Sequence, residues 1–142
     1  MFDKDSWNFS VEDIQVFTNG AFFNVVIIQD LVIKVPKKRE VNNSKYLKKI
    51  CDIQNGLSEK FDSVLPCKKI DNFIIMPRAD GVRADFMDDE KWRRIKKKVE
   101  KEIKSIKDNE NILLKDAVRK NIIYNEEEDK FYFIDFSNVK KL

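Results

Sequence analysis

Five short segments of the chain have the apolar residues and bounding turns that are typical of β-strands, and in Asp13–Thr18 apolar and polar residues alternate with a period of two. The first three segments follow one another closely, at Asp13–Thr18, Phe22–Ile28 and Leu31–Val35. Two more, Ser63–Lys69 and Ile70–Pro77, come after a stretch with helical spacing. The pattern therefore predicts a five-stranded antiparallel sheet, with one helix between its third and fourth strands.

Two other stretches carry apolar residues at the three- and four-residue spacing of an α-helix. The first helix is expected from about Arg39 to Gln54, with Gly56 marking its end. The second, over Asp85–Lys107, is the clearest helix of the sequence, and Asp85 is placed to cap it. Helices and sheet together predict an α+β fold. The apolar stripe of the second helix consists of Trp92, Ile95, Val99, Ile103 and Ile106.

Near the end of the chain, two short apolar runs flank a polar turn and predict a β-hairpin. The runs are Ile122–Tyr124 and Phe131–Ile134. Antiparallel pairing places the start of one strand beside the end of the other, so Asp116 and Asn121 should converge with Asp135. Such oxygen ligands suit Mg²⁺, which is often held by one or two carboxylates together with substrate phosphates. The alternative is that Asp116 and Asn121 are only turn residues.

Length and composition describe one ordinary soluble domain of 142 residues, of which 42% are hydrophobic and 37% charged. No apolar run approaches the ~18–20 residues of a membrane span, and Met1–Ser10 is acidic and aromatic rather than signal-like. The two cysteines, Cys51 and Cys67, have no metal-binding spacing and are expected to be reduced thiols. The expected location is the cytoplasm, with no membrane contact.

The sequence contains no histidine, which removes serine–histidine and cysteine–histidine nucleophile pairs and histidine-ligated zinc. Chemistry must then rest on carboxylates, lysines and a metal ion. The net charge of +3 is too small to argue for a polyanionic partner by itself.

One face of the helix Asp85–Lys107 is strongly basic. It is either a solvated surface or a docking surface for an acidic protein or nucleic acid. No aromatic residue interrupts the face, which argues against single-stranded nucleic acid. The basic residues are Lys91, Arg93, Arg94, Lys96, Lys97, Lys98 and Lys101.

Lys34 lies inside the apolar segment Val32–Val35, and a lysine in a buried strand is costly unless it is paired. Glu40 precedes Leu47 by two helical turns, projects on roughly the same inward face, and is the candidate partner. Glu59 is the fallback, although it lacks the helical register. Two plainer interpretations stay open: a lysine at a solvated sheet edge, and a glutamate that interacts only with the helix dipole.

These motifs together resemble the protein-kinase-like superfamily. The D-x-x-x-x-N spacing of Asp116 and Asn121, followed by a strand that ends in I-D-F at Asp135, is similar to a kinase catalytic loop and metal-binding motif. The V-I-K-V run around Lys34 is similar to the kinase V-A-I-K strand.

Two departures point to an atypical branch of that superfamily. Leu114-Lys115 replaces the usual His-Arg, and Ser137 stands where D-F-G has its glycine. Both departures occur more readily in small-molecule kinases and minimal bacterial kinases than in eukaryotic protein kinases. Arg119 or Lys120 could neutralise transferring charge, although neither occupies the position of the catalytic-loop lysine.

The resemblance implies a role for each motif residue. Lys34 would hold the α- and β-phosphates of ATP with Glu40 as its partner, and Asp116 would accept the proton of the substrate hydroxyl. Asn121 and Asp135 would bind Mg²⁺. The implied nucleotide-binding residues are Gly20, the surviving glycine in T-N-G-A-F-F-N-V; Met76, the gatekeeper; and Pro77 and Ala79, whose backbone would face adenine.

The expected protein is a single minimal kinase-like domain. About residues 1–78 would form an N-lobe with five strands and one helix, and about residues 79–142 a reduced C-lobe with one long helix and the catalytic hairpin. The expected function is ATP- and Mg²⁺-dependent phosphorylation of a protein hydroxyl, assisted by a docking partner.

Minimal kinases of comparable architecture include secreted bacterial effectors that bind ubiquitin or its conjugates, so secretion into a host cell and a ubiquitin-related partner are compatible with the resemblance. Two rival functions remain: a pseudokinase-type nucleotide- or protein-binding module, and a binder of acidic protein or, less favoured, nucleic acid through the basic helix.

Overall fold

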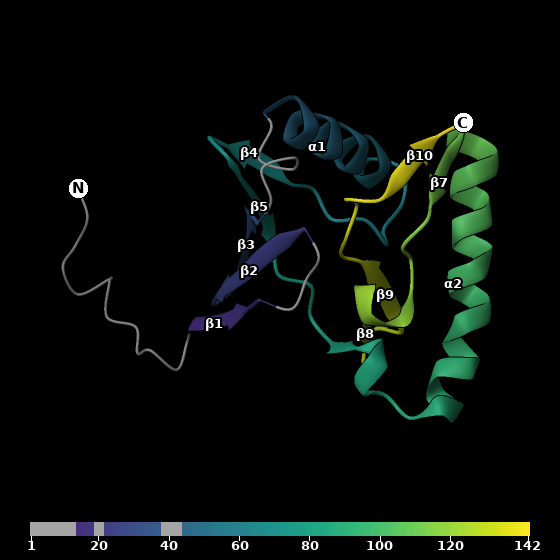
Figure 1. The fold of residues 1–142 in the computed structure, drawn as a ribbon. Helices are drawn as coiled ribbons and strands as arrows, with labels where there is room; N and C mark the ends of the chain where they lie inside the picture. Colours follow the sequence, from purple (N-terminus) through teal and green to yellow (C-terminus); the bar gives the residue numbers. More distant parts are fainter. Residues whose placement is uncertain (1–13, 19–21, 38–43) are drawn as a thin grey trace.

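The five predicted strand segments form the predicted five-stranded antiparallel sheet, with the strand order β1-β2-β3-β5-β4 (Figure 1). The computed structural model describes residues 14–18, 22–37 and 44–142. Lys34 pairs with Val25 on one side and with Ile74 on the other, so it stands in the middle of the sheet. The strands are β1 (Ile14–Phe17), β2 (Phe23–Ile28), β3 (Leu31–Pro36), β4 (Lys68–Ile70) and β5 (Phe73–Pro77).

Helix α1 (Ser44–Ser58) packs against β4 and β5 through the apolar stripe that the spacing predicted. Its expected end at Gly56 is wrong, because the helix continues to Ser58. Leu57 is 1% exposed, and burying this side chain in the core favours the extra residues over a glycine stop. The first part of the predicted helix falls on residues 38–43, outside the part of the chain that the structure describes.

The segment expected to form the strand Ser63–Lys69 is mostly irregular, and β4 begins only near its end. Val64 makes a single parallel bridge to Phe133 of the hairpin. A side chain of α1 satisfies part of the irregular backbone, because Gln54 Nε2 donates to the Leu65 carbonyl oxygen at 2.8 Å. Hydrogen bonds from the helix thus replace those of a longer strand.

Helix α2 (Asp89–Glu110) is the long helix that the sequence predicted, but it begins and ends a few residues later. Asp88 caps it instead of Asp85, because the Asp88 carboxylate accepts the Lys91 backbone N–H at 2.8 Å. Asp85 belongs to a separate 3-10 turn, η3 (Ala84–Phe86).

The predicted hairpin is present as β8 (Ile122–Asn125) and β9 (Lys130–Phe133). Two short pairings were not predicted: β6 (Val82–Arg83) extends the hairpin to three strands, and β10 (Val139–Lys141) pairs with β7 (Ile112–Leu114). Strands of two or three residues have no periodicity that a sequence pattern can reveal.

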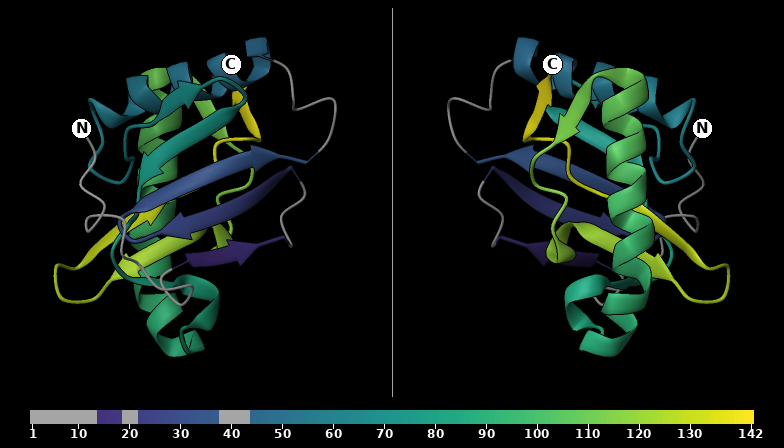
Figure 2. Two further views of the ribbon diagram at one scale, coloured as in Figure 1. Left: turned by 90° about the vertical axis from the view of Figure 1, so that its left-hand side faces the viewer. Right: turned by 90° about the vertical axis from the view of Figure 1, so that its right-hand side faces the viewer.

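The hairpin lies between the five-stranded sheet and α2 (Figure 1). Figure 2 shows the same order in depth, with the sheet nearest the viewer in the left view and α2 nearest in the right view. One hydrophobic cluster joins the layers: it contains Leu57 of α1, Ile106 of α2, Ile122 of the hairpin and Phe136, each at most 1% exposed. None of the described helices is long and apolar enough to cross a lipid bilayer.

Candidate functional site

A cleft of about 490 Å³ lies between the five-stranded sheet and the hairpin. Every predicted site residue within the described part of the chain lines it. Gly20 and Glu40 lie outside the described residues, so their predicted roles stay predictions. The lining residues that the sequence singled out are Lys34, Met76, Pro77, Ala79, Asp116, Asn121 and Asp135.

Lys34 is only 7% exposed, although it carries an amine. Its Nζ donates a hydrogen bond to the Ile134 carbonyl oxygen at 2.5 Å, which connects the sheet to the segment after the hairpin. Burial lowers the pKa of the Lys34 amine, while the negative charge of Asp135 acts in the opposite direction. The interpretation of Lys34 as a solvated edge residue is therefore wrong.

The fallback partner of Lys34 does not reach it. Glu59 is exposed and follows the last residue of α1. Among the described residues, Asp135 is the carboxylate whose charge acts on the Lys34 amine. The structure therefore places Lys34 beside one of the two predicted metal ligands.

The residue two positions after Asp135 holds its carboxylate. Ser137 donates twice to Asp135 Oδ1, from its backbone N–H at 2.9 Å and from its hydroxyl at 2.6 Å. The Ser137 carbonyl oxygen accepts a hydrogen bond from the Tyr46 hydroxyl of α1 at 2.6 Å. Burial, helped by the charge of Asp135, raises the pKa of Tyr46.

In the sequence Ser137 stands out only as a departure from D-F-G, and its contact with Asp135 was not predicted. A signal was available, because an aspartate side chain often accepts the backbone N–H two residues further on. The hydroxyl adds a second donor that a glycine could not supply.

The loop from Asp116 to Asn121 is closed by its own hydrogen bonds. Asn121 Nδ2 donates to the Asp116 carbonyl oxygen at 2.9 Å, and the Asn121 carbonyl oxygen accepts the Ile134 N–H at 3.1 Å. The second bond fixes the loop beside the segment that carries Asp135. The three predicted oxygen-bearing residues are thus held at one end of the hairpin, where each lines the cleft.

The donor atoms at this end of the cleft fit a Mg²⁺ ion that also binds phosphate. Asn121 uses Nδ2 within the loop, which leaves its Oδ1 as the ligand atom. Asp135 uses Oδ1 to accept from Ser137, which leaves Oδ2. Within the described ranges, no group of three or more His, Cys, Asp or Glu side chains could hold a metal. A cation here would complete its shell with phosphate oxygens and water, as Mg²⁺ commonly does.

Arg119 lies in the same loop, but its side chain is engaged outside the cleft. The guanidinium donates to the carbonyl oxygens of Ala84, at 2.7 Å, and of Met87, and it binds the Asp89 carboxylate at 2.8 Å. These contacts tie the loop to η3 and to the start of α2. Arg119 therefore does not serve the cleft, and Lys120 is the neighbouring cation that lines it.

The rest of the cleft is mainly apolar and has two opposing walls. Val25 and Val32 come from the sheet, whereas Ile123 and Ile134 come from the hairpin side. Met76, which is 2% exposed, adds to the lining at the end of β5. An apolar space between two walls, beside an exposed chain segment, suits an aromatic ring such as a purine.

Phe23 stands where the kinase pattern has its third glycine, and Phe22 precedes it. Phe22 and Phe23 belong to T-N-G-A-F-F-N-V, and both line the cleft. Phe23 is 6% exposed and belongs to the core cluster. The Phe23 ring fills space that a glycine would leave open, and the Phe22 ring adds to the lining of the cleft.

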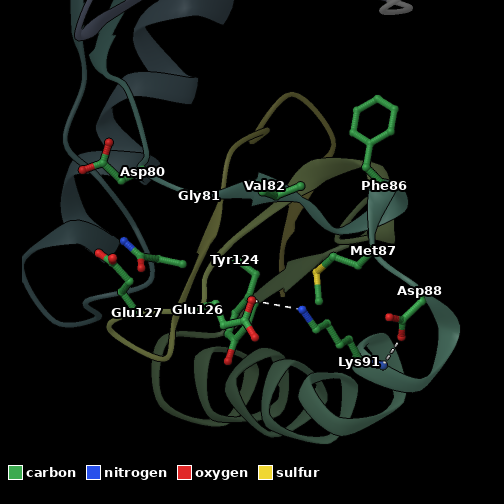
Figure 3. A pocket seen from close by; sticks show the side chains of 11 residues that line it. Asp80, Gly81, Val82, Phe86, Met87, Asp88, Lys91, Tyr124, Glu126 and Glu127 are labelled. Carbon is green, nitrogen blue, oxygen red and sulfur yellow. Dashed lines mark hydrogen bonds and ion pairs between the residues drawn. The ribbon is translucent and has the colours of Figure 1, made fainter.

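A second pocket, of about 520 Å³, opens beside the segment that links the sheet to α2 (Figure 3). An ion pair of 3.0 Å between Lys91 of α2 and Glu126 of the hairpin turn lies in its wall. Phe86 lines both cavities, but none of the predicted site residues lines the second pocket. The predicted chemistry is therefore confined to the first cleft.

Comparison with solved structures defines the fold. The granulovirus kinase PK-1 of Cydia pomonella granulovirus matches with a TM-score of 0.57 and 14% sequence identity, over 93% of this chain and 54% of that one. The Rio2 kinase from Chaetomium thermophilum, solved as an ADP/Mg²⁺-phosphoaspartate complex, matches with a TM-score of 0.65 and 14% identity, over 91% of this chain and 49% of that one.

The protein thus has a protein-kinase-like fold. The chain spans about half the length of these two kinase structures. No protein-family model and no curated protein sequence matches it. The likeness at 14% identity shows the fold, and the chemistry must be argued from the cleft itself.

Proposed function

We propose that this protein is an ATP- and Mg²⁺-dependent phosphotransferase of the minimal, atypical protein-kinase type, acting on a protein hydroxyl. The observation that carries the proposal is that one residue of the sheet and three residues around the distant hairpin line one cleft of about 490 Å³. They are Lys34, Asp116, Asn121 and Asp135. Phosphoryl transfer needs little covalent chemistry from a protein, because positioning and charge stabilisation carry most of the catalysis.

The nucleotide would bind with adenine between the apolar walls, beside the backbone of Pro77 and Ala79 and next to Met76. Lys34 would exchange its hydrogen bond to the Ile134 carbonyl for one to a phosphate oxygen. A nearby phosphate favours the charged amine and so counteracts the burial that lowers its pKa. Nucleotide binding would thereby add a partner to a buried charge that has one backbone partner among the residues that the structure describes.

Asn121 Oδ1 and Asp135 Oδ2 would hold Mg²⁺ against the phosphates, and Ser137 would keep the Asp135 carboxylate in place. When bound there, the ion neutralises charge on the phosphate oxygens. These two oxygens are the ones that the hydrogen bonds of Asn121 and Asp135 leave available.

Asp116 would accept the proton of the substrate hydroxyl while that oxygen bonds to the γ-phosphorus and the bond to the ADP oxygen breaks. Lys120 lines the same cleft and would balance negative charge on the transferred group. Arg119 would act indirectly by fixing the loop that carries both residues.

We further propose that an acidic protein partner docks on α2. The ion pairs Lys91–Glu126 and Lys98–Asp129 engage two of its lysines with the hairpin. Lys97 and Lys101 are exposed, and no ion pair within the described residues engages them. Screening acts within about 8–10 Å at moderate ionic strength, so phosphorylation of such a partner should fall as salt is raised.

A pseudokinase-type nucleotide-binding module is the second candidate, and one observation favours it. Phe23 replaces the third glycine of the kinase phosphate-binding pattern, and its ring lines the cleft together with that of Phe22. If they keep the γ-phosphate from reaching Asp116, nucleotide would bind without turnover. Measured turnover therefore separates the two candidates.

The deciding experiment is a thermal-shift titration with ATP, with and without Mg²⁺. At about 100 times Kd the ligand should add about 2.7 kcal/mol to the free energy of unfolding. Asp135→Asn should lose the Mg²⁺-dependent part and stay folded, whereas Asp71→Asn, in the exposed β4–β5 turn, should behave as wild type. Equal Mg²⁺-dependent stabilisation of wild type and Asp135→Asn would contradict the metal assignment.

A further inference from the structure

The two cysteines of the chain are distant in sequence and adjacent in the fold. Cys51 is buried in α1, and Cys67 is half-buried just before β4. Cys67 Sγ donates to the Cys51 carbonyl oxygen at 3.9 Å, and the two thiols lie close enough for each to shift the pKa of the other. Both thiols are free in this structure.

The backbone around Cys67 is held firmly against α1. Asn55, one helical turn after Cys51, donates from Nδ2 to the Cys67 carbonyl oxygen at 3.0 Å. Its Oδ1 accepts the Cys67 N–H at 2.8 Å. One amide side chain thus binds both backbone groups of Cys67, so the fold fixes the position of Cys67 against the helix that carries Cys51.

The environment gives the two sulfurs different acidity. The hydrogen bond from Cys67 lowers the pKa of the Cys51 thiol, whereas the same hydrogen bond and burial raise the pKa of the Cys67 thiol. Cys51 is therefore the better thiolate, which is the reactive form in disulfide chemistry. Cys67 is the sulfur that solvent can reach.

We propose that Cys51 and Cys67 form a site of reversible oxidation, at which an intramolecular disulfide ties α1 to the segment that precedes β4. With a peroxide as oxidant, the two sulfurs lose two electrons and both thiol hydrogens and form the S–S bond. The peroxide O–O bond breaks, and its oxygens leave as two molecules of water. A dithiol reductant reverses the reaction by thiol–disulfide exchange.

The position of this pair connects it to the cleft. The charge of Lys34 acts on both sulfurs. The same helix carries Tyr46, whose hydroxyl binds the Ser137 carbonyl. The disulfide would fix α1 against the sheet from which Lys34 projects. This proposal rests on the geometry of the thiols and stands whether or not the protein transfers phosphate.

The test compares purified reduced protein with protein treated with hydrogen peroxide. Free thiols should fall from two to zero per chain, and the mass should fall by about 2 Da, as expected for a disulfide rather than for oxygen addition. The product should run as a monomer on a non-reducing gel. A disulfide that closes the loop between Cys51 and Cys67 should raise Tm by roughly 5–12 °C, and reduction with dithiothreitol should reverse this increase.

Cys67→Ser should show none of these changes and should leave Cys51 as one free thiol. Cys51→Ser is the reciprocal control, and Cys51→Ala replaces it if the serine does not fold in the core. Persistence of two thiols, a disulfide found only between chains, or a gain of oxygen mass in the wild type would overturn the proposal. ATP binding by the oxidised and reduced forms is measured in a separate titration. If neither form binds ATP, the thiol count, the mass and the Tm still test the disulfide.

Discussion

Lys34 in the cleft and Arg119 at the junction with α2 both carry a positive charge, yet the two regions satisfy that charge in opposite ways. Lys34 is buried against one backbone oxygen, and burial lowers the pKa of its amine. Arg119 binds two backbone oxygens and the Asp89 carboxylate, and its guanidinium lies 5.6 Å from the centroid of the Trp92 ring.

The comparison distinguishes a residue that can bind a ligand, Lys34, from one that supports the fold, Arg119. An ammonium group has three donors, and Lys34 spends one of them on a protein oxygen within the described residues. A buried charge with spare donors and a shifted pKa marks a candidate binding site, whereas a guanidinium held by three hydrogen bonds from all three of its nitrogens marks a fixed structural contact. Changes in the cleft should therefore alter binding and turnover first, and changes at the junction should alter stability first.

The largest effect is expected from Asp116→Asn in the cleft. Loss of the proton acceptor should lower kcat by ~10²–10⁴-fold, the usual contribution of a general base. Stability and ATP affinity should change little, since no hydrogen bond of the fold uses this carboxylate among the described contacts. A phosphorylation assay on cell lysate measures the loss, with Asp71→Asn as the control. Unchanged turnover would remove Asp116 from the mechanism.

Arg119→Ala should act on stability rather than on chemistry. It leaves the carbonyl oxygens of Ala84 and Met87 and the Asp89 carboxylate without their donor, which should cost about 2–3 kcal/mol of unfolding free energy. Denaturant unfolding measures this loss. Arg119→Lys should recover only part, because an ammonium lacks the planar fork. An Arg119→Ala protein with native stability and abolished ATP binding would contradict the structural role of Arg119 and place it in the binding site.

Ser137→Ala tests a smaller effect inside the cleft. It removes the hydroxyl donor to Asp135 but keeps the backbone N–H. A hydrogen bond to a charged group contributes about 1.5 kcal/mol, so affinity for ATP with Mg²⁺ should fall by about tenfold. Affinity for ATP alone should not change. Titration calorimetry distinguishes the two, Ser137→Thr should restore the donor, and an equal loss in both titrations would argue for a general packing defect.

The smallest effect is expected on the exposed face of α2. Lys97→Glu and Lys101→Glu should weaken an acidic docking partner by about 1 kcal/mol or less per charge, because surface charges are screened. Lys68→Glu, on β4, is the matched control. Phosphorylation of lysate proteins at low and high salt reads out the change. If phosphorylation changes neither with these substitutions nor with salt, the proposed docking surface on α2 is wrong.

Local sequence was sufficient for the parts of the protein whose information lies within a few residues. The apolar runs Phe22–Ile28 and Leu31–Val35 predicted β2 and β3, and the apolar stripe predicted α2. The motif spacing also picked out Asp116, Asn121 and Asp135, because short-range hairpin geometry already brings the two ends of its strands together.

Tertiary structure alone decided which atoms those side chains meet. The Lys34 amine reaches the carbonyl of Ile134, one hundred positions away, and the Tyr46 hydroxyl reaches that of Ser137. Arg119 turns to η3 and α2 instead of the cleft because oxygen acceptors and a carboxylate gather there only after folding. Such choices depend on the packing of segments distant in sequence, about which a local pattern of polarity carries no information.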